Sequence, residues 1–286
     1  MNAIEIKNLS KHYKDFSLDN VSFSLPSGCI LGLIGENGAG KSTTIRMIMN
    51  TARRDSGEIS VLGTDNRLPA FQAVKEDIGV VLDEANFPEM LTAKQVNNVM
   101  KYTFARWDEA MYFDYLKKFA LPEKKAFKDF SRGMKMKLAI AAALSHSPKL
   151  LVLDEATGGL DPIVRDEILD IFNDFTRQDE SHSILMSSHI VSDLEKLCDY
   201  IAFLHKGKLL FCEEKDRLLE TYGVVHCSKE ELAALPKSAV QGGTRTSKYG
   251  GAEALVLRSK VPADLKVDYA SIEDIIVFLA KERSAK

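Results

Sequence analysis

A glycine-rich segment near the N-terminus constrains the fold of this chain more than any other feature. Residues 35–43 read GENGAGKST, and their first eight positions match the pattern G-x-x-x-x-G-K-[ST]. An apolar run precedes the segment at 29–34, and apolar residues follow it at helical spacing over 43–49. A strand that leads through glycines into a helix presents backbone N–H groups and a helix N-terminus to an anion. The segment therefore predicts a loop that binds a polyphosphate, and an ordinary glycine-rich turn is the alternative.

Two residues of this loop have chemical roles of their own. Lys41 is placed to reach the β- and γ-phosphates of a nucleotide, and the hydroxyl of Ser42 is placed to ligate Mg2+. The other candidate nucleotide-binding residues of the loop are Gly35, Glu36, Asn37, Gly38, Ala39, Gly40 and Thr43. Alone, the loop indicates a nucleotide but not the purpose for which it is bound.

Length and composition set broad limits. The 286 residues can form one large domain, or a large and a small one. A formal net charge of -3 gives no indication of nucleic acid or an anionic membrane surface as a partner. The four cysteines show no C-x-x-C spacing, so buried free thiols in a reducing compartment are expected. The longest apolar run, 138–144, is too short to span a bilayer, so we expect a soluble, cytoplasmic chain.

An antiparallel β layer is expected before the phosphate loop. Residues 4–6, 16–18 and 21–25 alternate between apolar and polar side chains, as in half-buried strands. In this layer Tyr13 lies 28 residues before Lys41. Its ring could return to stack on a nucleotide base, and a surface tyrosine beside a turn is the alternative.

A helical subdomain is expected between strands of the main sheet, over about residues 84–148. Short strands are predicted at 57–63 and 78–82, after which apolar residues fall at helical spacing from 91 to 121. Thr92 and Asp108 are candidate N-caps, and Ser131 is expected to cap a further helix. The aromatic residues of this region are expected in its core more than at a cofactor.

Two adjacent carboxylates follow the next predicted strand. The apolar run at 150–153 ends in Asp154 and Glu155, which packing explains poorly, although a solvated strand end remains the alternative. Asp161 and a proline then predict a helix start, and a strand at 183–186 leads to a Ser-Ser-His sequence that ends at His189. A hairpin over 200–211 closes the large domain, and the alternation of strands and helices predicts an α/β fold.

The last part of the chain is expected to form a small α+β appendage. It contains a charged helix near 213–222, apolar stretches at 224–227 and 254–257, a Gly/Ser/Thr-rich loop at 241–251 and an amphipathic helix at 271–280. No motif in this part indicates a chemistry.

Over residues 1–215, the chain resembles the ATP-binding subunit of an ABC transporter. The resemblance rests on the phosphate loop, FSRGM at 130–134, LLVLDE at 150–155, GLD at 159–161 and SH at 188–189, in the order of the family. It implies a P-loop NTPase core with a mixed sheet, an antiparallel β subdomain and the inserted helical subdomain. Residues 216–286 would then be a C-terminal accessory domain.

The resemblance also implies a role for each candidate site residue. Lys41 and the loop amides hold the phosphates of ATP, and Asp154 organises Mg2+ directly or through water. Glu155 polarises the attacking water, and His189 contacts the γ-phosphate. Tyr13 matches the aromatic position of the family and becomes a candidate for stacking on the base.

In this family, the signature segment of one subunit contacts ATP on the other. Ser131 and Gly133 would make these contacts, so one chain cannot build a complete site. The resemblance implies a nucleotide-sandwich dimer, as a homodimer or a heterodimer, with Asp161 near its seam. It also implies a separate integral membrane permease, which would hold the subunit at the inner face of the cell membrane, and no nucleic-acid partner.

The chain departs from the common pattern of the family at Asp83 and in the signature. Asp83 stands where glutamine is usual, and its carboxylate can still ligate Mg2+ or a bound water while adding negative charge beside the phosphates. The signature is FSRGM where LSGGQ is usual, so Arg132 could add positive charge at the phosphates of the partner's nucleotide. The S-[KR]-G-M form resembles the exporter branch, with ABC-2-like export of drugs or peptides.

Two other functions are open at this point. The first is a soluble ABC-type ATPase acting on ribosomes or DNA. Relatives that act on ribosomes usually carry two such domains, and relatives that act in DNA repair carry very long coiled-coil insertions. The chain has neither feature, which argues against this function. The second is a non-hydrolysing regulatory switch, which Asp83 and Met134 leave open. The expected docking surface for a permease is the segment after Asp83 together with the helical insertion, including Phe87 and the residues as far as Val99. Core packing explains these apolar residues equally well.

Overall fold

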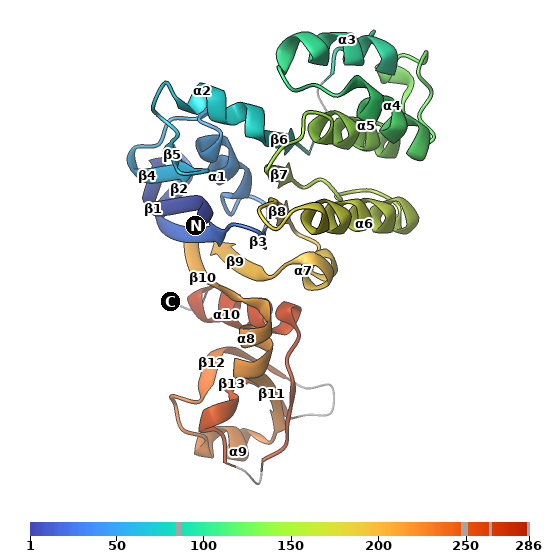
Figure 1. The fold of residues 1–286 in the computed structure, drawn as a ribbon. Helices are drawn as coiled ribbons and strands as arrows, with labels where there is room; N and C mark the ends of the chain where they lie inside the picture. The colour runs from blue at the N-terminus through green and yellow to red at the C-terminus, as the bar shows by residue number, and fades with distance from the viewer. Residues whose placement is uncertain (84–86, 247–250, 263–264, 285–286) are drawn as a thin grey trace. The chain divides into compact units, whose positions relative to one another are not determined.

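The computed structural model describes residues 1–83, 87–246, 251–262 and 265–284. The chain divides into two compact units, Met1–Cys212 and Glu213–Lys286 (Figure 1). The phosphate loop and all other candidate site residues belong to the first unit.

A six-stranded sheet in the order β10-β9-β3-β8-β7-β6 forms the centre of the first unit. Its strands are β3 (Ile30–Ile34), β6 (Ile78–Val81), β7 (Leu150–Asp154), β8 (Ser183–Ser188), β9 (Tyr200–His205) and β10 (Lys208–Glu214). β3 is parallel to β8 and β9, and β7 is parallel to β6 and β8. Both β3 and β7 are buried along their whole length, which is why they are apolar runs. The loops after β3, β7 and β8 therefore emerge at one edge of the sheet.

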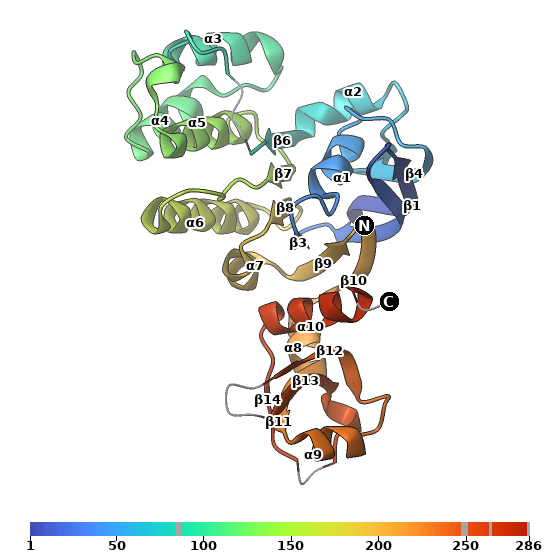
Figure 2. The ribbon, with the colours of Figure 1, turned by 180° about the vertical axis from the view of Figure 1, so that it is seen from behind.

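Helices cover both faces of this sheet. α1 (Lys41–Ile48) lies on one face, and α5 (Arg132–Leu144), α6 (Pro162–Gln178) and α7 (Val191–Leu197) lie on the other (Figures 1 and 2). The expected start of α6 is confirmed, because the Asp161 side chain accepts a hydrogen bond from the Val164 N–H and Pro162 occupies the first turn.

The expected hairpin between β9 and β10 is confirmed, and it packs against the phosphate loop. Lys206 and Gly207, which join the two strands, have φ values of 47° and 75°, as a two-residue hairpin turn requires. The Gly207 N–H donates to the Ala39 carbonyl at 3.1 Å. A Cβ at Gly207 would lie 1.8 Å from the Ser17 carbonyl oxygen, so this close approach requires glycine.

An antiparallel sheet in the order β2-β1-β4-β5 forms the expected β layer. Its strands are β1 (Asn2–His12), β2 (Ser17–Pro26), β4 (Ser56–Val61) and β5 (Thr64–Asp65). The expectation of separate strands at 16–18 and 21–25 is wrong, because β2 is continuous. Asn20 has a φ of 52° and the β1–β2 register shifts nearby, so a bulge absorbs the break in alternation. One buried cluster joins this sheet to α1 and the six-stranded sheet through residues such as Ile4, Ile45 and Leu31.

The inserted helical region contains α3 (Ala93–Thr103), α4 (Glu109–Lys118) and the start of α5. Both expected N-caps are confirmed: Thr92 forms a capping box with Gln95, and Asp108 accepts from the Met111 N–H. The expectation that the aromatic residues are core is wrong for Tyr102, which is 93% exposed. Residues 84–86, where this subdomain is expected to begin, lie outside the described residues. The short helices α2 (Phe71–Val74) and η1 (Lys75–Asp77) precede the region, and η2 (Phe127–Asp129) lies within it between α4 and α5.

The second unit is an α+β domain with its own antiparallel sheet, in the order β12-β13-β11-β14. Its elements are α8 (Lys215–Thr221), β11 (Tyr222–Cys227), α9 (Lys229–Ala234), β12 (Val240–Thr246), β13 (Ala252–Leu257), η3 (Arg258–Lys260), β14 (Val267–Tyr269) and α10 (Ile272–Ser284). The expectation of a loop at 241–251 is wrong for residues 241–246, because they belong to strand β12. Residues 247–250 lie outside the described residues. Gly242 has a φ of 71° at a register shift, so a bulge lets this glycine-containing segment pair as a strand.

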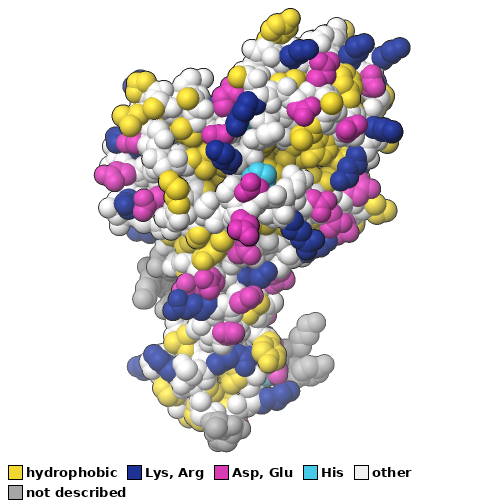
Figure 3. Space-filling view, viewed as in Figure 1, with side chains coloured by type: hydrophobic (Ala, Val, Ile, Leu, Met, Phe, Trp, Pro, Cys, Tyr) yellow, Lys and Arg dark blue, Asp and Glu magenta, His cyan; other side chains and the backbone are white. Residues whose placement is uncertain are grey.

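On the face shown in Figure 3, acidic and basic side chains are interspersed over both units. Among the described residues, no helix is both long enough and apolar enough to cross a bilayer.

Candidate nucleotide-binding site

A cavity of about 680 Å³ lies beside the phosphate loop in the first unit. It is bounded by this loop, the β1–β2 turn, the end of β6, the start of α5 and the segments after β7 and β8. Its lining residues are Asp15, Phe16, Asn37, Gly38, Gly40, Lys41, Ser42, Thr43, Asp83, Arg132, Glu155, Gly158, Gly159 and His189.

The phosphate loop has the backbone that its glycines predict. Gly38 and Gly40 have φ values of 82° and 112°. Gly40 is the N-cap of α1 and provides no side-chain hydrogen bond to the first turn. The first N–H groups of α1 therefore have no side-chain cap, which leaves the helix start suited to an anion. The Lys41 ammonium donates to the Gly35 carbonyl at 2.8 Å and is nearly buried.

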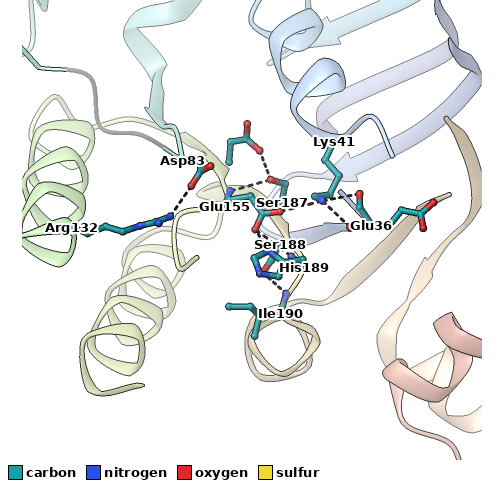
Figure 4. A network of polar contacts seen from close by, with 11 residues as sticks. Glu36, Lys41, Asp83, Arg132, Glu155, Ser187, Ser188, His189 and Ile190 are labelled. Carbon is teal, nitrogen blue, oxygen red and sulfur yellow. Dashed lines mark hydrogen bonds and ion pairs between the residues drawn. The ribbon is translucent and has the colours of Figure 1, made fainter. Parts of the chain in front are cut away.

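Lys41 and His189 both contact Glu155 in this cavity (Figure 4). The Lys41 Nζ lies 3.2 Å from the Glu155 Oε1, and the His189 Nδ1 lies 2.6 Å from the Glu155 Oε2. Glu155 has a φ of 51°, a conformation that non-glycine residues rarely adopt. Its N–H donates to both the carbonyl and the hydroxyl of Ser187, which holds the strained residue at the strand end.

The second carboxylate, Asp154, is held by the same serine. The Ser187 hydroxyl donates to the Asp154 Oδ1 at 2.5 Å, and Asp154 is 6% exposed. A neighbouring cavity of about 730 Å³ is lined in part by Ser42, Asp83 and Asp154. These three candidate metal-binding residues are therefore brought together by α1 and the ends of β6 and β7.

Arg132 contacts Asp83, a pairing that the sequence motifs do not predict. The Arg132 Nη2 lies 3.1 Å from the Asp83 Oδ1 (Figure 4). The guanidinium also packs on Gly159, where a Cβ would lie 2.8 Å from its Nη1. Nothing local in the sequence indicates that residues 49 positions apart form an ion pair.

Ser131, Gly133 and Asp161 do not line the cavity of their own chain. The Ser131 hydroxyl caps α5 by accepting a hydrogen bond from the Met134 N–H, which confirms the expected cap. A Cβ at Gly133 would have only ordinary contacts with side chains of the Leu160–Val164 region. Close packing within the chain therefore does not require glycine at this position.

Tyr13 also lies apart from the cavity lining. It is 48% exposed, its ring stacks on Phe16 with centroids 6.5 Å apart, and the Lys11 ammonium lies over it at 5.3 Å. Phe16 and Asp15 do line the cavity. No motif predicts either residue as part of the site. The alternating pattern marks Phe16 as a strand residue, and only its place beside the turn indicates the site.

Two buried groups adjoin the site without lining the cavity. The His205 Nδ1 lies 3.3 Å from the Glu36 Oε1, so β9 contacts the phosphate loop through a buried imidazole. Asp193 is buried on α7 and pairs with the Arg165 Nε at 3.2 Å. Burial raises the pKa of Asp193 above its ordinary value, and the nearby Arg165 and His189 oppose this rise.

The sequence of the chain is similar to those of known ATP-binding proteins of transporters. Residues 18–158 match the family described as ABC transporter. The lantibiotic transport ATP-binding protein SrtF of Streptococcus pyogenes is 37% identical over 216 residues, which cover 74% of this chain and 91% of that protein. The bacitracin transport ATP-binding protein BcrA of Bacillus licheniformis is 35% identical, over 72% of this chain and 68% of that protein.

Solved structures show the same fold. The structure of an ATP-binding subunit of an ABC transporter has a TM-score of 0.68 and 29% identity, covering 76% of this chain and 91% of that one. A dimeric ATP-binding cassette bound to ADP and Pi has a TM-score of 0.65 and 22% identity, covering 74% of this chain and 98% of that one. The resemblance inferred from the motifs is thereby confirmed, and the chain belongs to the ABC transporter family as one of its ATP-binding subunits.

Proposed function

We propose that the chain binds and hydrolyses ATP as one half of a nucleotide-sandwich dimer and thereby drives export through a separate membrane permease. The observation that carries this proposal is the convergence of Lys41, Glu155 and His189 on one cavity beside the phosphate loop. A cation, a carboxylate and an imidazole at a helix N-terminus are suited to hold and hydrolyse a triphosphate.

Each of these residues has a role that its position supports. The Lys41 ammonium and the N–H groups of residues 35–43 bind the β- and γ-phosphates. Glu155 accepts a hydrogen bond from the attacking water and polarises it. His189, which contacts the Glu155 carboxylate, binds the γ-phosphate and responds to its presence.

The residues around Ser42 fit a magnesium ion. The hydroxyl of Ser42 and the carboxylates of Asp83 and Asp154 line one cavity, and hard oxygen donors are the ligands that Mg2+ prefers. When bound, Mg2+ would neutralise charge on the β- and γ-phosphates. Ser187 positions the carboxylate of Asp154 for this contact.

The proposed dimer is supported by three candidate residues that do not line the cavity of their own chain. Ser131, Gly133 and Asp161 are absent from the cavity lining of their own chain, and Gly133 is not explained by internal packing. We assign Ser131 and Gly133 to the ATP of the partner subunit and Asp161 to the seam between subunits. Tyr13, half exposed at the β1–β2 turn, stacks on the base, with Phe16 supporting its ring.

The permease docks on the helical region. A cavity of about 260 Å³ between this region and β6 is lined by Phe87 and other mostly apolar residues, and Met90 and Val99 of the region are exposed. An apolar cavity and exposed apolar side chains in one region favour a protein partner over solvent. The relatives named for lantibiotic and bacitracin transport support an antimicrobial compound as the cargo. The subunit would then be peripheral to the membrane through its permease.

The proposal is tested with Glu155→Gln in the purified chain. We expect phosphate release to fall by about 100-fold or more, as loss of a general base does, while ATP binding is kept and light scattering shows ATP-dependent dimers. Glu167→Gln is the matched control, because Glu167 pairs with Lys137 on the surface away from the cavity. Undiminished hydrolysis in Glu155→Gln would contradict the assignment of the base. If the wild-type chain hydrolyses no ATP either with or without its permease, the chain acts as a nucleotide switch and not as an ATPase.

A further inference from the structure

Asp83 and Arg132, two of the residues that depart from the common pattern of the family, contact each other. Asp83 follows the end of strand β6, and Arg132 is the first residue of α5. Their side chains form an ion pair with 3.1 Å between the Arg132 Nη2 and the Asp83 Oδ1 (Figure 4). One departure supplies an anion and the other supplies its cation, so the two changes are complementary within one subunit.

A second contact defines where the guanidinium lies. A Cβ at Gly159 would be 2.8 Å from the Arg132 Nη1 and 2.9 Å from its Cζ. Gly159 has a φ of 67° and belongs to the segment between Glu155 and Asp161. The Arg132 head group therefore lies between Asp83 and this segment, inside the lining of the candidate nucleotide site.

The ion pair is weak enough to exchange. Both side chains are more than half exposed, at 57% for Arg132 and 53% for Asp83. Exposed pairs of this kind change an equilibrium by only about two- to fivefold. A triphosphate is a stronger partner for arginine, because it carries more charge and accepts bidentate hydrogen bonds.

We propose that Arg132 is a further phosphate-binding residue of the ATPase and that Asp83 holds it within its own subunit until the dimer closes. On closure, Arg132 leaves the Asp83 carboxylate and binds the phosphates of the ATP on the partner subunit, beside the contact assigned to Ser131. This inference rests on the proposed ATP-dependent dimer. It predicts that the two members of the pair act in opposite directions, since Asp83 competes for the guanidinium that the dimer needs.

The experiment measures the ATP concentration at half-maximal dimer formation, by light scattering of the full chain in the Glu155→Gln background. EDTA is present, so that metal ligation by Asp83 does not contribute. Asp83→Asn is expected to lower this concentration by about two- to fivefold, because Arg132 is released. Arg132→Gln is expected to raise it by at least about as much, because a charged contact to phosphate is lost.

A double-mutant cycle separates exchange from simple removal of a negative charge. In the Arg132→Gln background, Asp83→Asn should have a smaller effect than in the parent, because the competing pair is already gone. Arg106→Gln is the matched control. Arg106 pairs with Asp77 at 2.6 Å and also joins the helical region to the core, but outside the cavity. It should leave the half-maximal ATP concentration unchanged.

The outcomes distinguish this inference from the proposed function. If Asp83→Asn and Arg132→Gln shift the ATP concentration in the same direction, the pair is only structural and the exchange is wrong. Equal effects of Asp83→Asn in both backgrounds would also overturn it. If the Glu155→Gln parent forms no dimer with ATP at all, the proposed function fails and this inference fails with it.

Discussion

One residue at the end of β8, Ser187, determines how the two carboxylates of the site are held. Ser187 is fully buried, donates to the Asp154 Oδ1 and accepts from the Glu155 N–H. One side chain therefore fixes both the candidate metal ligand and the candidate base. Because Glu155 has a rarely populated backbone conformation, its position depends on such contacts more than that of an ordinary strand residue does.

Ser187→Ala is expected to lower kcat by about 10- to 100-fold, since a hydrogen bond to a charged group is lost at the reacting centre. Ser183→Ala is the matched control on the same strand. Ser183 is equally buried and accepts from the Gly28 N–H at 2.9 Å, at the opposite end of β8. Steady-state ATPase assays and melting temperatures should show similar losses of stability in both variants but a loss of kcat only in Ser187→Ala. Equal losses of kcat would contradict the positioning role.

At the scale of elements, the start of α5 combines a structural and a functional role in one residue. The Ser131 hydroxyl caps the helix within its own chain, and the same hydroxyl is assigned to the ATP of the partner. If Ser131 only capped the helix, any side chain that accepts a hydrogen bond from an N–H group of the first turn could replace it. The two roles can therefore be separated by substitution.

Ser131→Ala removes the cap and is expected to lower the free energy of unfolding by about 0.5–2 kcal/mol. Ser131→Asp keeps an acceptor and adds charge favourable to the helix dipole, so stability should be retained. The same carboxylate would repel the phosphates of the partner's ATP and prevent dimer formation. Urea denaturation and light scattering with ATP test both effects. A Ser131→Asp chain that dimerises as readily as the parent would leave the serine with a capping role alone.

Elements that depend on local patterns are predictable from the sequence, and pairings across the fold are not. The caps at Thr92 and Asp108, the buried strand β7 and the phosphate loop each follow from a short stretch of residues. The continuous β2 and the strand β12 depend on bulges, which an alternation pattern does not contain. The Asp83–Arg132 contact depends on how the helical region packs on the core, so the sequence identifies both residues as unusual without pairing them.

At the scale of the whole molecule, the chain consists of two units with separate cores. The lining of the candidate site comes entirely from residues of Met1–Cys212. The second unit buries its own cluster, which includes Val225, Ala254 and Val256. Because the units have separate cores, a ligand of the first unit can stabilise it without stabilising the second.

ATP is therefore expected to stabilise the two units unequally. At 100 times its Kd, ATP should raise the free energy of unfolding of Met1–Cys212 by about 2.7 kcal/mol and slow hydrogen exchange of its best-protected amides by about 100-fold. Exchange in Glu213–Lys286 should stay unchanged. Mass spectrometry of the full Glu155→Gln chain, in which ATP is not consumed, measures both units in one sample, and Lys41→Ala in the same background is the control without phosphate binding. An equal rise in protection of the second unit would mean that the chain unfolds as one cooperative body, and that the accessory domain is energetically coupled to the nucleotide site.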